Sequence, residues 1–326
     1  MLKPAKTTIM LAVTAALMLG LSSCDSKETT PAMTNSPVDI ADEKAAPMTE
    51  QQQKAYDKAL SRIKQAKADN AIYLYLDEMG LTQLPSEIGQ LTSLEELYLM
   101  RNSLTGLPPE VGQLTSLTYL NLCDNDLTSL PPEIGQLTSL EKLSLSGNSL
   151  TSLPPEISQL TSLIELFLFD NSLTTLPPEI GQLTSLEWLS IDGNHLTSLP
   201  PEIGQLISLG KLNLDGNSLA GLPAEIRQLT SLAVLWLNDN SLTDLPLEIG
   251  QLTSLEELDL GNNNLTFLPQ SLTQLDMEFV WGKKYGGYGI NLYGNPLEEP
   301  PVEIVKKGKE AIKQYFAEQD SSAGGD

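Results

Sequence analysis

Basic residues, histidine, cysteine and aromatic residues are all scarce in this chain of 326 residues. Lysine and arginine together number 19 against 42 aspartates and glutamates, which gives a net charge of −23. Because affinity for phosphates depends on basic side chains, this balance argues against nucleic acid as a partner. One histidine and two cysteines cannot supply a metal site of imidazole or thiolate ligands, and we expect no cofactor.

The sequence also lacks an apolar run long enough to cross a membrane near its start. Two lysines precede an apolar run of 13 residues at 9–21, whereas a spanning helix needs about 20 residues. The run ends in Leu-Ser-Ser and Cys24. This order resembles the lipobox of bacterial lipoproteins, which implies a signal peptide at 1–23 and a lipid on Cys24 that anchors the protein without spanning the bilayer. An ordinary signal peptide with a chance cysteine is the alternative.

Residues 24–49 are polar, contain prolines and show no apolar period, so we predict a disordered tether. Asp25 follows the cysteine directly. In enteric-type bacteria this resembles an inner-membrane retention signal, so we expect a lipid-anchored protein of the bacterial cell envelope that faces the periplasm. The outer membrane and the cell surface remain open.

Asparagines recur at intervals of 23 residues from Asn102 to Asn263. Met79 occupies this position in the first unit, and Asn295 occupies it in the last, after a nine-residue insertion. A fixed period of this size over ten units predicts a solenoid, in which each unit buries its apolar side chains against its neighbours.

Within the unit around Asn148, Leu143 and Leu145 alternate as expected for a short strand with one buried face. Pro155 fits the first position of a helical turn, where its missing N–H is not needed, and Glu156 then lies at the positive end of that turn. Each unit therefore predicts a strand, a turn and one short helical turn.

The unit LTSLEKLSLSGNSLTSLPPEISQ is similar to the 23-residue leucine-rich repeat of bacterial proteins and of Ras-linked scaffold proteins. The resemblance covers about residues 71–300. It implies an α/β solenoid, a horseshoe of about ten repeats with a parallel sheet on the concave face and short helical or 3-10 turns on the convex face. The asparagines would form a ladder bonded to neighbouring backbone.

Helical spacing of apolar residues predicts caps at both ends, over 50–70 and 302–326. Between them we expect repeats 1–9 at 71–275 and an insertion loop with the final repeat at 276–301. The C-terminal stretch is similar to the segment that closes the repeats of Roco-type proteins. No GxxxxGK[ST] motif is present, so their GTPase activity is not implied.

Aromatic residues gather in four columns of the repeat, at positions −6, −4, −2 and −1 from the ladder asparagine. These columns alternate with the leucines, so we expect them to face solvent beside the strand. Eight of the nine aromatics in 71–275 fall there, and Tyr293 and Trp281 follow in the last unit and the insertion. We predict that they form a protein-binding face, whereas strand propensity is the competing explanation. The eight are Tyr73, Tyr75, Tyr98, Tyr119, Phe167, Phe169, Trp188 and Trp236.

Acidic residues dominate the repeats, with 26 acids against four bases in 69–275. Asp170, Asp192, Asp215 and Asp259 lie beside the expected strands, and we include them in the predicted binding face. Such a face favours a protein or peptide with a basic surface, and we expect a monomer. Calcium bound by the Asp-Asn turns is an alternative that involves Asp124, Asp126, Asp170, Asp192, Asp215 and Asp239.

These patterns indicate a binding protein rather than an enzyme. A hydrolase that uses Ser190 and His195, with Asp192 beside them, is an alternative of another class, although no nucleophile elbow is present. A surface adhesin or host-interaction factor and a structural envelope spacer also remain open. The insertion at 276–289 could bind a partner or cover the core, and Cys123, at position −2, is expected to be exposed.

Overall fold

The structure of the protein, a computed structural model, describes residues 48–282 and 288–323. The expected signal peptide at 1–23, Cys24 and nearly all of the tether at 24–49 lie outside these residues, as does part of the insertion. In the part that is described, no helix is long and apolar enough to span a bilayer.

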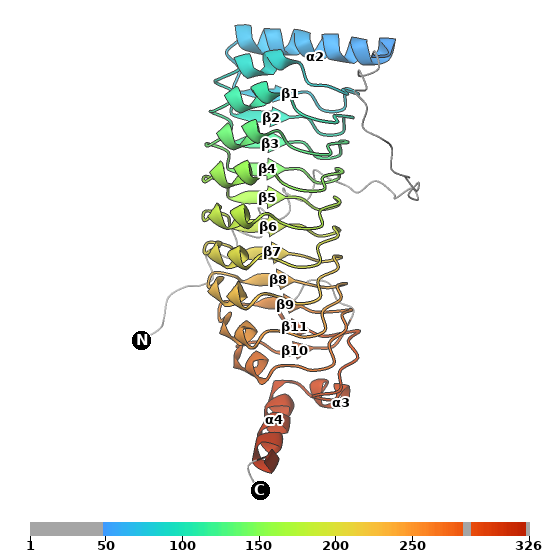
Figure 1. Cartoon of the computed structure of the whole chain (residues 1–326), viewed down its shortest axis with the longest axis vertical. Helices are drawn as coiled ribbons and strands as arrows, with labels where there is room; N and C mark the ends of the chain where they lie inside the picture. The colour runs from blue at the N-terminus through green and yellow to red at the C-terminus, as the bar shows by residue number, and fades with distance from the viewer. Residues whose placement is uncertain (1–47, 283–287, 324–326) are drawn as a thin grey trace. The chain divides into compact units, whose positions relative to one another are not determined.

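One parallel sheet of eleven strands runs through the repeats in the order β1 to β9, then β11, then β10 (Figure 1). From β1 to β9 each residue pairs with the residue 23 positions further on, as Leu74 does with Leu97. The strands are β1 (Tyr73–Tyr75), β2 (Glu96–Tyr98), β3 (Tyr119–Asn121), β4 (Lys142–Ser144), β5 (Glu165–Phe167), β6 (Trp188–Ser190), β7 (Lys211–Asn213), β8 (Val234–Trp236), β9 (Glu257–Asp259), β10 (Phe279–Val280) and β11 (Gly289–Asn291).

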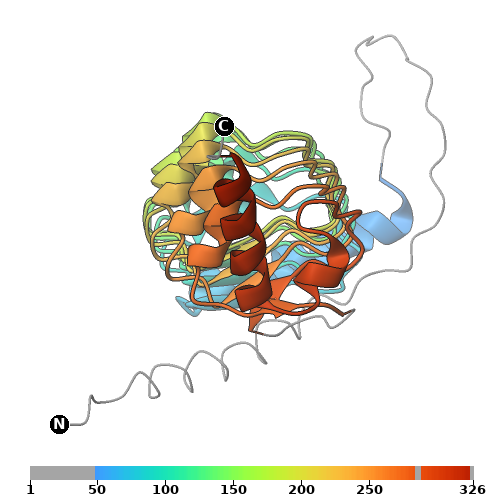
Figure 2. The same ribbon diagram turned by 90° about the horizontal axis from the view of Figure 1, so that it is seen from below.

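Each repeat ends in a five-residue 3-10 helix, and these helices lie above one another along one side of the stack (Figures 1 and 2). In η4, Pro155 occupies the first turn and Glu156 follows it, as the sequence predicts. The helices are η1 (Ser86–Gln90), η2 (Pro109–Gln113), η3 (Pro132–Gln136), η4 (Pro155–Gln159), η5 (Pro178–Gln182), η6 (Pro201–Gln205), η7 (Ala224–Gln228), η8 (Leu247–Gln251) and η9 (Gln270–Gln274).

The core is a continuous column of leucine and isoleucine between the sheet and the 3-10 helices. The predicted asparagine ladder is confirmed along its edge. Asn171 donates to the carbonyls of Leu145 and Leu168 at 3.1 and 3.0 Å and accepts from the Leu150 N–H at 3.0 Å. Each ladder amide therefore joins two successive repeats.

The residue before the ladder asparagine adopts a left-handed backbone in most repeats. Asp170 has φ 53° and Gly193 has φ 63°. A Cβ on Gly193 would lie 2.5 Å from Asp170 Oδ1, so the aspartate side chain occupies the space that the next glycine leaves open. Aspartate, asparagine and glycine at this column fit the tendency of these residues to tolerate positive φ.

The N-terminal cap is the helix α2 (Glu50–Ala68), which begins with a capping box between Thr49 and Gln52. Ala59 and Ile63 are buried and join the leucine core. The helix thus covers apolar side chains that the first repeat would otherwise expose.

At the other end, the insertion adds a strand to the sheet. The chain forms β10 at the edge and then returns to place β11 between β9 and β10. Met277 is buried, and Phe279 and Trp281 pack against the core, so the described part of the insertion covers the core end. Gly289 has φ 120°, and a Cβ there would lie 2.7 Å from the Glu278 carbonyl oxygen.

The C-terminal cap is two helices rather than one continuous stretch. α3 (Val302–Val305) and α4 (Lys309–Ala323) are separated at Gly308, which has φ 90°. Ile312 and Phe316 of α4 are buried in the core. Helical caps at both ends, a parallel sheet and 3-10 turns confirm the predicted α/β solenoid.

Candidate functional site

The candidate site lies on the sheet face, by which we mean the side of the sheet opposite the leucine core. In β1, Tyr73 and Tyr75 are 56% and 52% exposed while Leu74 between them is buried. The same alternation places positions −6 and −4 of every repeat on this face, as the sequence predicts.

Four tyrosines form a contact chain over the first three strands. Tyr73 and Tyr75 have ring centroids 6.0 Å apart, Tyr75 stacks on Tyr98 at 4.6 Å, and Tyr98 meets the edge of Tyr119 at 5.3 Å. The Tyr98 hydroxyl donates to Glu96 Oε2 at 2.5 Å, and burial raises its pKa. This tyrosine cluster is amphipathic, with broad ring faces and polar hydroxyl tips.

The middle of the face alternates lysines with aromatic rings. Lys142 Nζ lies 5.6 Å from the Tyr119 centroid and 5.4 Å from the Phe167 centroid. Phe167 meets Trp188 edge to face at 5.0 Å, and Lys211 Nζ lies 4.7 Å from the Trp188 centroid. Both ammonium groups are therefore placed for cation–π contacts.

The expectation that columns −4 and −2 are exposed is wrong in the middle of the sheet. Phe167 is 7% exposed and Cys123 is 1% exposed. Side chains of one column stand on strands about 4.8 Å apart and shield each other. Phe167 lies against Trp188, and Cys123 stands between Met100 and Ser146 of the same column. Neither Phe167 nor Cys123 joins the leucine core.

Further along the face, Trp236 is half-buried and its Nε1 donates to Glu257 Oε1 at 2.8 Å. At the C-terminal end, Trp281 and Tyr293 meet at 6.2 Å, with Lys306 Nζ 5.5 Å from the Trp281 centroid. The predicted aromatics thus form separate contact groups rather than one continuous surface. Phe169 is half-buried beside the middle group.

Of the predicted acids, Asp170, Asp192 and Asp215 form a row at positions −1 and −2, beside the strands, whereas Asp259 pairs with Trp236 at position −4. Burial raises the pKa of Asp215 to about 7, with the carboxylates of Asp259, Asp192 and Asp239 adding to the shift and a hydrogen bond from the Asn238 N–H opposing it. Such crowding of carboxylates in a desolvated place penalises their ionised form.

The other predicted acids shift in the same direction. Burial raises the pKa of Asp192 and Asp259, and it also raises that of Asp170, to which Asp124 adds. Asp192 accepts from the Ser190 hydroxyl at 2.5 Å. The row therefore holds its negative charge less readily than the sequence suggests.

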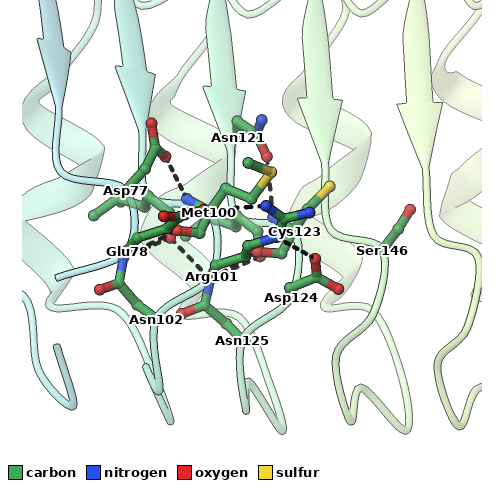
Figure 3. Close-up of polar contacts among 12 residues, drawn as sticks. Asp77, Glu78, Met100, Arg101, Asn102, Asn121, Cys123, Asp124, Asn125 and Ser146 are labelled. Atoms are coloured by element: carbon green, nitrogen blue, oxygen red, sulfur yellow. Dashed lines mark hydrogen bonds and ion pairs between the residues drawn. The ribbon is translucent and has the colours of Figure 1, made fainter. Parts of the chain in front are cut away.

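At the N-terminal end of the sheet, Arg101 lies between the acidic side chains of Glu78 and Asp124 (Figure 3). Arg101 Nη1 lies 3.1 Å from Glu78 Oε1, and its Nε lies 3.6 Å from Asp124 Oδ2. Asp77 accepts from the Met100 N–H at 2.7 Å. Ion pairs between successive repeats thus reduce the local repulsion among the acids.

In the described part of the chain, the side chains are not arranged for either alternative, a hydrolase that uses Ser190 and His195 or a calcium site. His195 is exposed, and none of the hydrogen bonds between described residues joins it to Ser190 or Asp192. Among the residues that are described, no group of three or more His, Cys, Asp or Glu side chains is placed to hold a metal ion. Neither a catalytic triad nor a calcium site is therefore assembled there.

Lys142 and Lys211 belong to the site, although the sequence prediction treated them only as two of the few bases in the repeats. Both occupy position −6, on β4 and β7. The sequence could have indicated them, because position −6 also holds Tyr73, Tyr119 and Trp188.

The fold and its face define a class of protein, the repeat scaffolds that present a sheet face to a partner. Family models match residues 110–192 and 166–242 as a leucine-rich repeat region, residues 230–276 as a pair of leucine-rich repeats and residues 93–114 as a single repeat. The chain belongs to the leucine-rich repeat family. Proteins of this family are in general binding scaffolds rather than enzymes. A search of curated proteins found no match.

Solved structures include several similar chains. A leucine-rich repeat protein of Leptospira interrogans is 35% identical, with 70% of this chain and 73% of that chain covered and a TM-score of 0.41. The functional domain of InlJ from Listeria monocytogenes is 32% identical, with coverage of 63% and 42% and a TM-score of 0.54. The PEPR1 chain of the PEPR1–AtPEP1 structure is 32% identical, with coverage of 66% and 30% and a TM-score of 0.55. The chain spans less than half the length of the last two.

Proposed function

We propose that this protein is a membrane-anchored binding protein that holds a partner protein or an extended peptide on its sheet face. The observation that carries the proposal is the gathering of aromatic side chains there, with Tyr73 and Tyr75 more than half exposed. Exposed tyrosine and tryptophan supply large contact area at low conformational cost and are enriched where binding energy concentrates.

The charge of the repeats supports a partner with a basic surface. Residues 69–275 hold 26 acids and four bases, and this negative charge attracts a cationic partner and speeds its approach. PEPR1, which is 32% identical over the shared region, was solved together with AtPEP1, and this favours a protein or peptide as the partner.

The proposal places the protein in a bacterial cell envelope with a lipid on Cys24. Its support is the order of basic residues, apolar run and cysteine in the sequence. Asp25 favours the inner membrane facing the periplasm. If the protein reaches the cell surface, we propose instead that it acts as an adhesin or host-interaction factor.

Site-specific photo-crosslinking tests the binding face. Benzoylphenylalanine would replace Tyr75 or Trp236 on the sheet face of the full chain in its native cells. Matched controls carry it at Ile207 or Leu247, which are 57% and 68% exposed on the side of the 3-10 helices. We expect the same protein or peptide adduct from both sheet-face positions and none from the controls. Equal adducts from the two sets would contradict the proposal.

Lipidation is tested separately by growth with an alkyne-tagged fatty acid. The wild-type chain should carry the tag and partition with membranes, and Cys24→Ser should do neither. A wild-type chain without the tag would refute the anchor. Protease treatment of intact cells then separates a surface adhesin, which is cleaved, from a periplasm-facing protein, which is protected.

A further inference from the structure

Two hydrogen-bond donors lie together on β6 and β7 and find no acceptor among the residues that the structure describes. The indole nitrogen of Trp188 is buried, and residues 48–282 and 288–323 give it no hydrogen-bond partner. Lys211 pairs with Trp188 in the sheet register, and its ammonium lies over the same indole, 4.7 Å from the ring centroid. None of the ion pairs between described residues includes Lys211. A buried donor without an acceptor loses the hydrogen bond that it makes with water in the unfolded chain, which is unfavourable.

The same face shows how such donors are satisfied elsewhere. The Trp236 indole nitrogen donates to Glu257, which stands on the next strand, at 2.8 Å. Lys142 occupies the same column as Lys211, and its ammonium lies 2.6 Å from Glu165, again on the next strand. In both cases the chain supplies a carboxylate from the following repeat.

At Lys211 the following repeat supplies no such group. The residue that pairs with Lys211 on β8 is Val234, at the position where Lys142 finds Glu165. An uncharged side chain thus stands where the neighbouring pattern places a carboxylate. At position −6 the carboxylates stand on β2, β5 and β9, as Glu96, Glu165 and Glu257, and β8 has none.

We propose that Trp188 and Lys211 bind an acidic side chain, an aspartate or a glutamate, of the segment that occupies the sheet face. The proposal deepens the proposed function and rests on it, because it names one chemical requirement of the partner. The requirement is local, and the partner can still be basic along the rest of its length.

Burial lowers the pKa of Lys211, with Glu165 acting in the opposite direction. A partner carboxylate would stabilise the charged form and replace water with a charge-assisted hydrogen bond. The lysine stem is flexible, so the ammonium can swing off the ring and bring the carboxylate over the indole N–H. The two donors would then share one acceptor.

A randomised peptide display library, panned against the full chain, tests this inference. Wild type is compared with Lys211→Met, which keeps the apolar stem of the side chain. Lys142→Met is the matched control, because the Lys142 ammonium already pairs with the Glu165 carboxylate. We expect wild type and Lys142→Met to select peptides enriched in Asp or Glu at one shared position, and Lys211→Met to lose that enrichment. In a selected peptide, Glu→Gln at that position should weaken binding to wild type about tenfold, and should change binding to Lys211→Met little.

Other outcomes overturn the inference in distinguishable ways. Peptides that need the sheet face but show no acidic position would refute the acidic contact and leave the proposed function standing. An acidic position that survives in Lys211→Met would also refute it. If no peptide is selected, or if the selected peptides bind a Tyr75→Ser, Trp236→Ser double variant as tightly as wild type, the proposed function fails together with the inference.

Discussion

Each ladder asparagine hydrogen-bonds main-chain groups of its own repeat and of the repeat before it. Asn194 donates to the carbonyls of Leu168, Ile191 and Asp192 at 2.9, 3.1 and 3.2 Å, and its Oδ1 accepts from the Leu173 N–H at 2.9 Å. The side chain is buried. Aspartate could accept but could not donate, so asparagine suits this position better than its charged isostere.

Asn194→Ala should therefore lower the free energy of unfolding by about 3 kcal/mol, because the buried Leu173 N–H loses its acceptor and three carbonyls each lose one of their donors. Urea denaturation monitored by circular dichroism measures this change. The neighbouring substitution His195→Ala, at an exposed side chain, should stay within about 0.5 kcal/mol. Equal effects of the two substitutions would show that the ladder contributes little.

Asp215 links stability to pH. Its pKa is about 7 in the folded chain, against about 3.9 in the unfolded chain. The folded chain therefore binds the proton more tightly, so the stability that protonated Asp215 contributes is fully present below about pH 4 and is lost as the pH rises through about 7. Burial also raises the pKa of Asp192 and Asp259, which act in the same direction.

Asp215→Asn should reduce the loss of stability between pH 5 and pH 8 by about 2 kcal/mol. Urea midpoints at the two pH values measure the difference. Asp126→Asn removes the same charge at an exposed position and should leave the pH dependence of wild type unchanged. A wild-type chain that gains stability from pH 5 to pH 8 would contradict the direction.

Among the elements, α2 protects the first strand of the sheet. Arg62 Nη1 donates to the Tyr75 carbonyl oxygen at 2.9 Å and approaches Met79 Sδ at 3.7 Å. An edge strand with unpaired backbone groups can pair with another chain, and a covering side chain prevents this.

Arg62→Ala should expose that edge. We expect faster amide hydrogen exchange in β1 and a tendency to associate, with a loss of about 1 kcal/mol in unfolding free energy. Hydrogen exchange with mass spectrometry resolves the strand. Lys58→Ala, an exposed substitution on the same helix, serves as the control and should leave the exchange of β1 unchanged. Identical exchange in the two variants would argue against a role for Arg62.

The elements also show where sequence reasoning succeeds. The alternating Leu143 and Leu145, and the proline before Glu156, predict the strands and 3-10 turns because each follows from local backbone geometry. The order β9, β11, β10 could not be predicted, because it depends on where the segments 276–282 and 288–291 join the sheet. The residues near Gly289 give no periodic signal.

At the candidate site, the sequence predicts which side chains share a face but not how deeply each is buried. The exposed state of Tyr75 follows from its column, whereas Phe167 in the same column is buried by contacts with Trp188 and Lys142. Those contacts depend on neighbouring strands, so a single repeat does not encode them. The shifted pKa of Asp215 has the same origin.

At the scale of the whole stack, each repeat contacts its neighbours and the two caps close the core. Phe316 of α4 is 8% exposed and belongs to the core at the C-terminal end. In such an array, a defect destabilises nearby repeats more than distant ones.

Phe316→Ala should therefore loosen β9 and β11 while β1 to β3 stay protected. The expected cost is about 3 kcal/mol, the range for truncating a buried aromatic side chain. Hydrogen exchange along the chain measures where protection falls. Phe267→Ala, at a side chain that is 43% exposed, is the control. Uniform loss of protection across all strands would show that the array unfolds as one cooperative unit instead.

The constant register from β1 to β9 has a consequence for how the gene can change. Because every residue pairs with the one 23 positions later, recombination that duplicates or deletes 23 codons leaves each remaining pairing intact. Such an event would move the tyrosine cluster relative to Trp236 by one whole strand and would leave both caps unchanged. The reach of the binding face can therefore evolve in discrete steps, without redesign of the core.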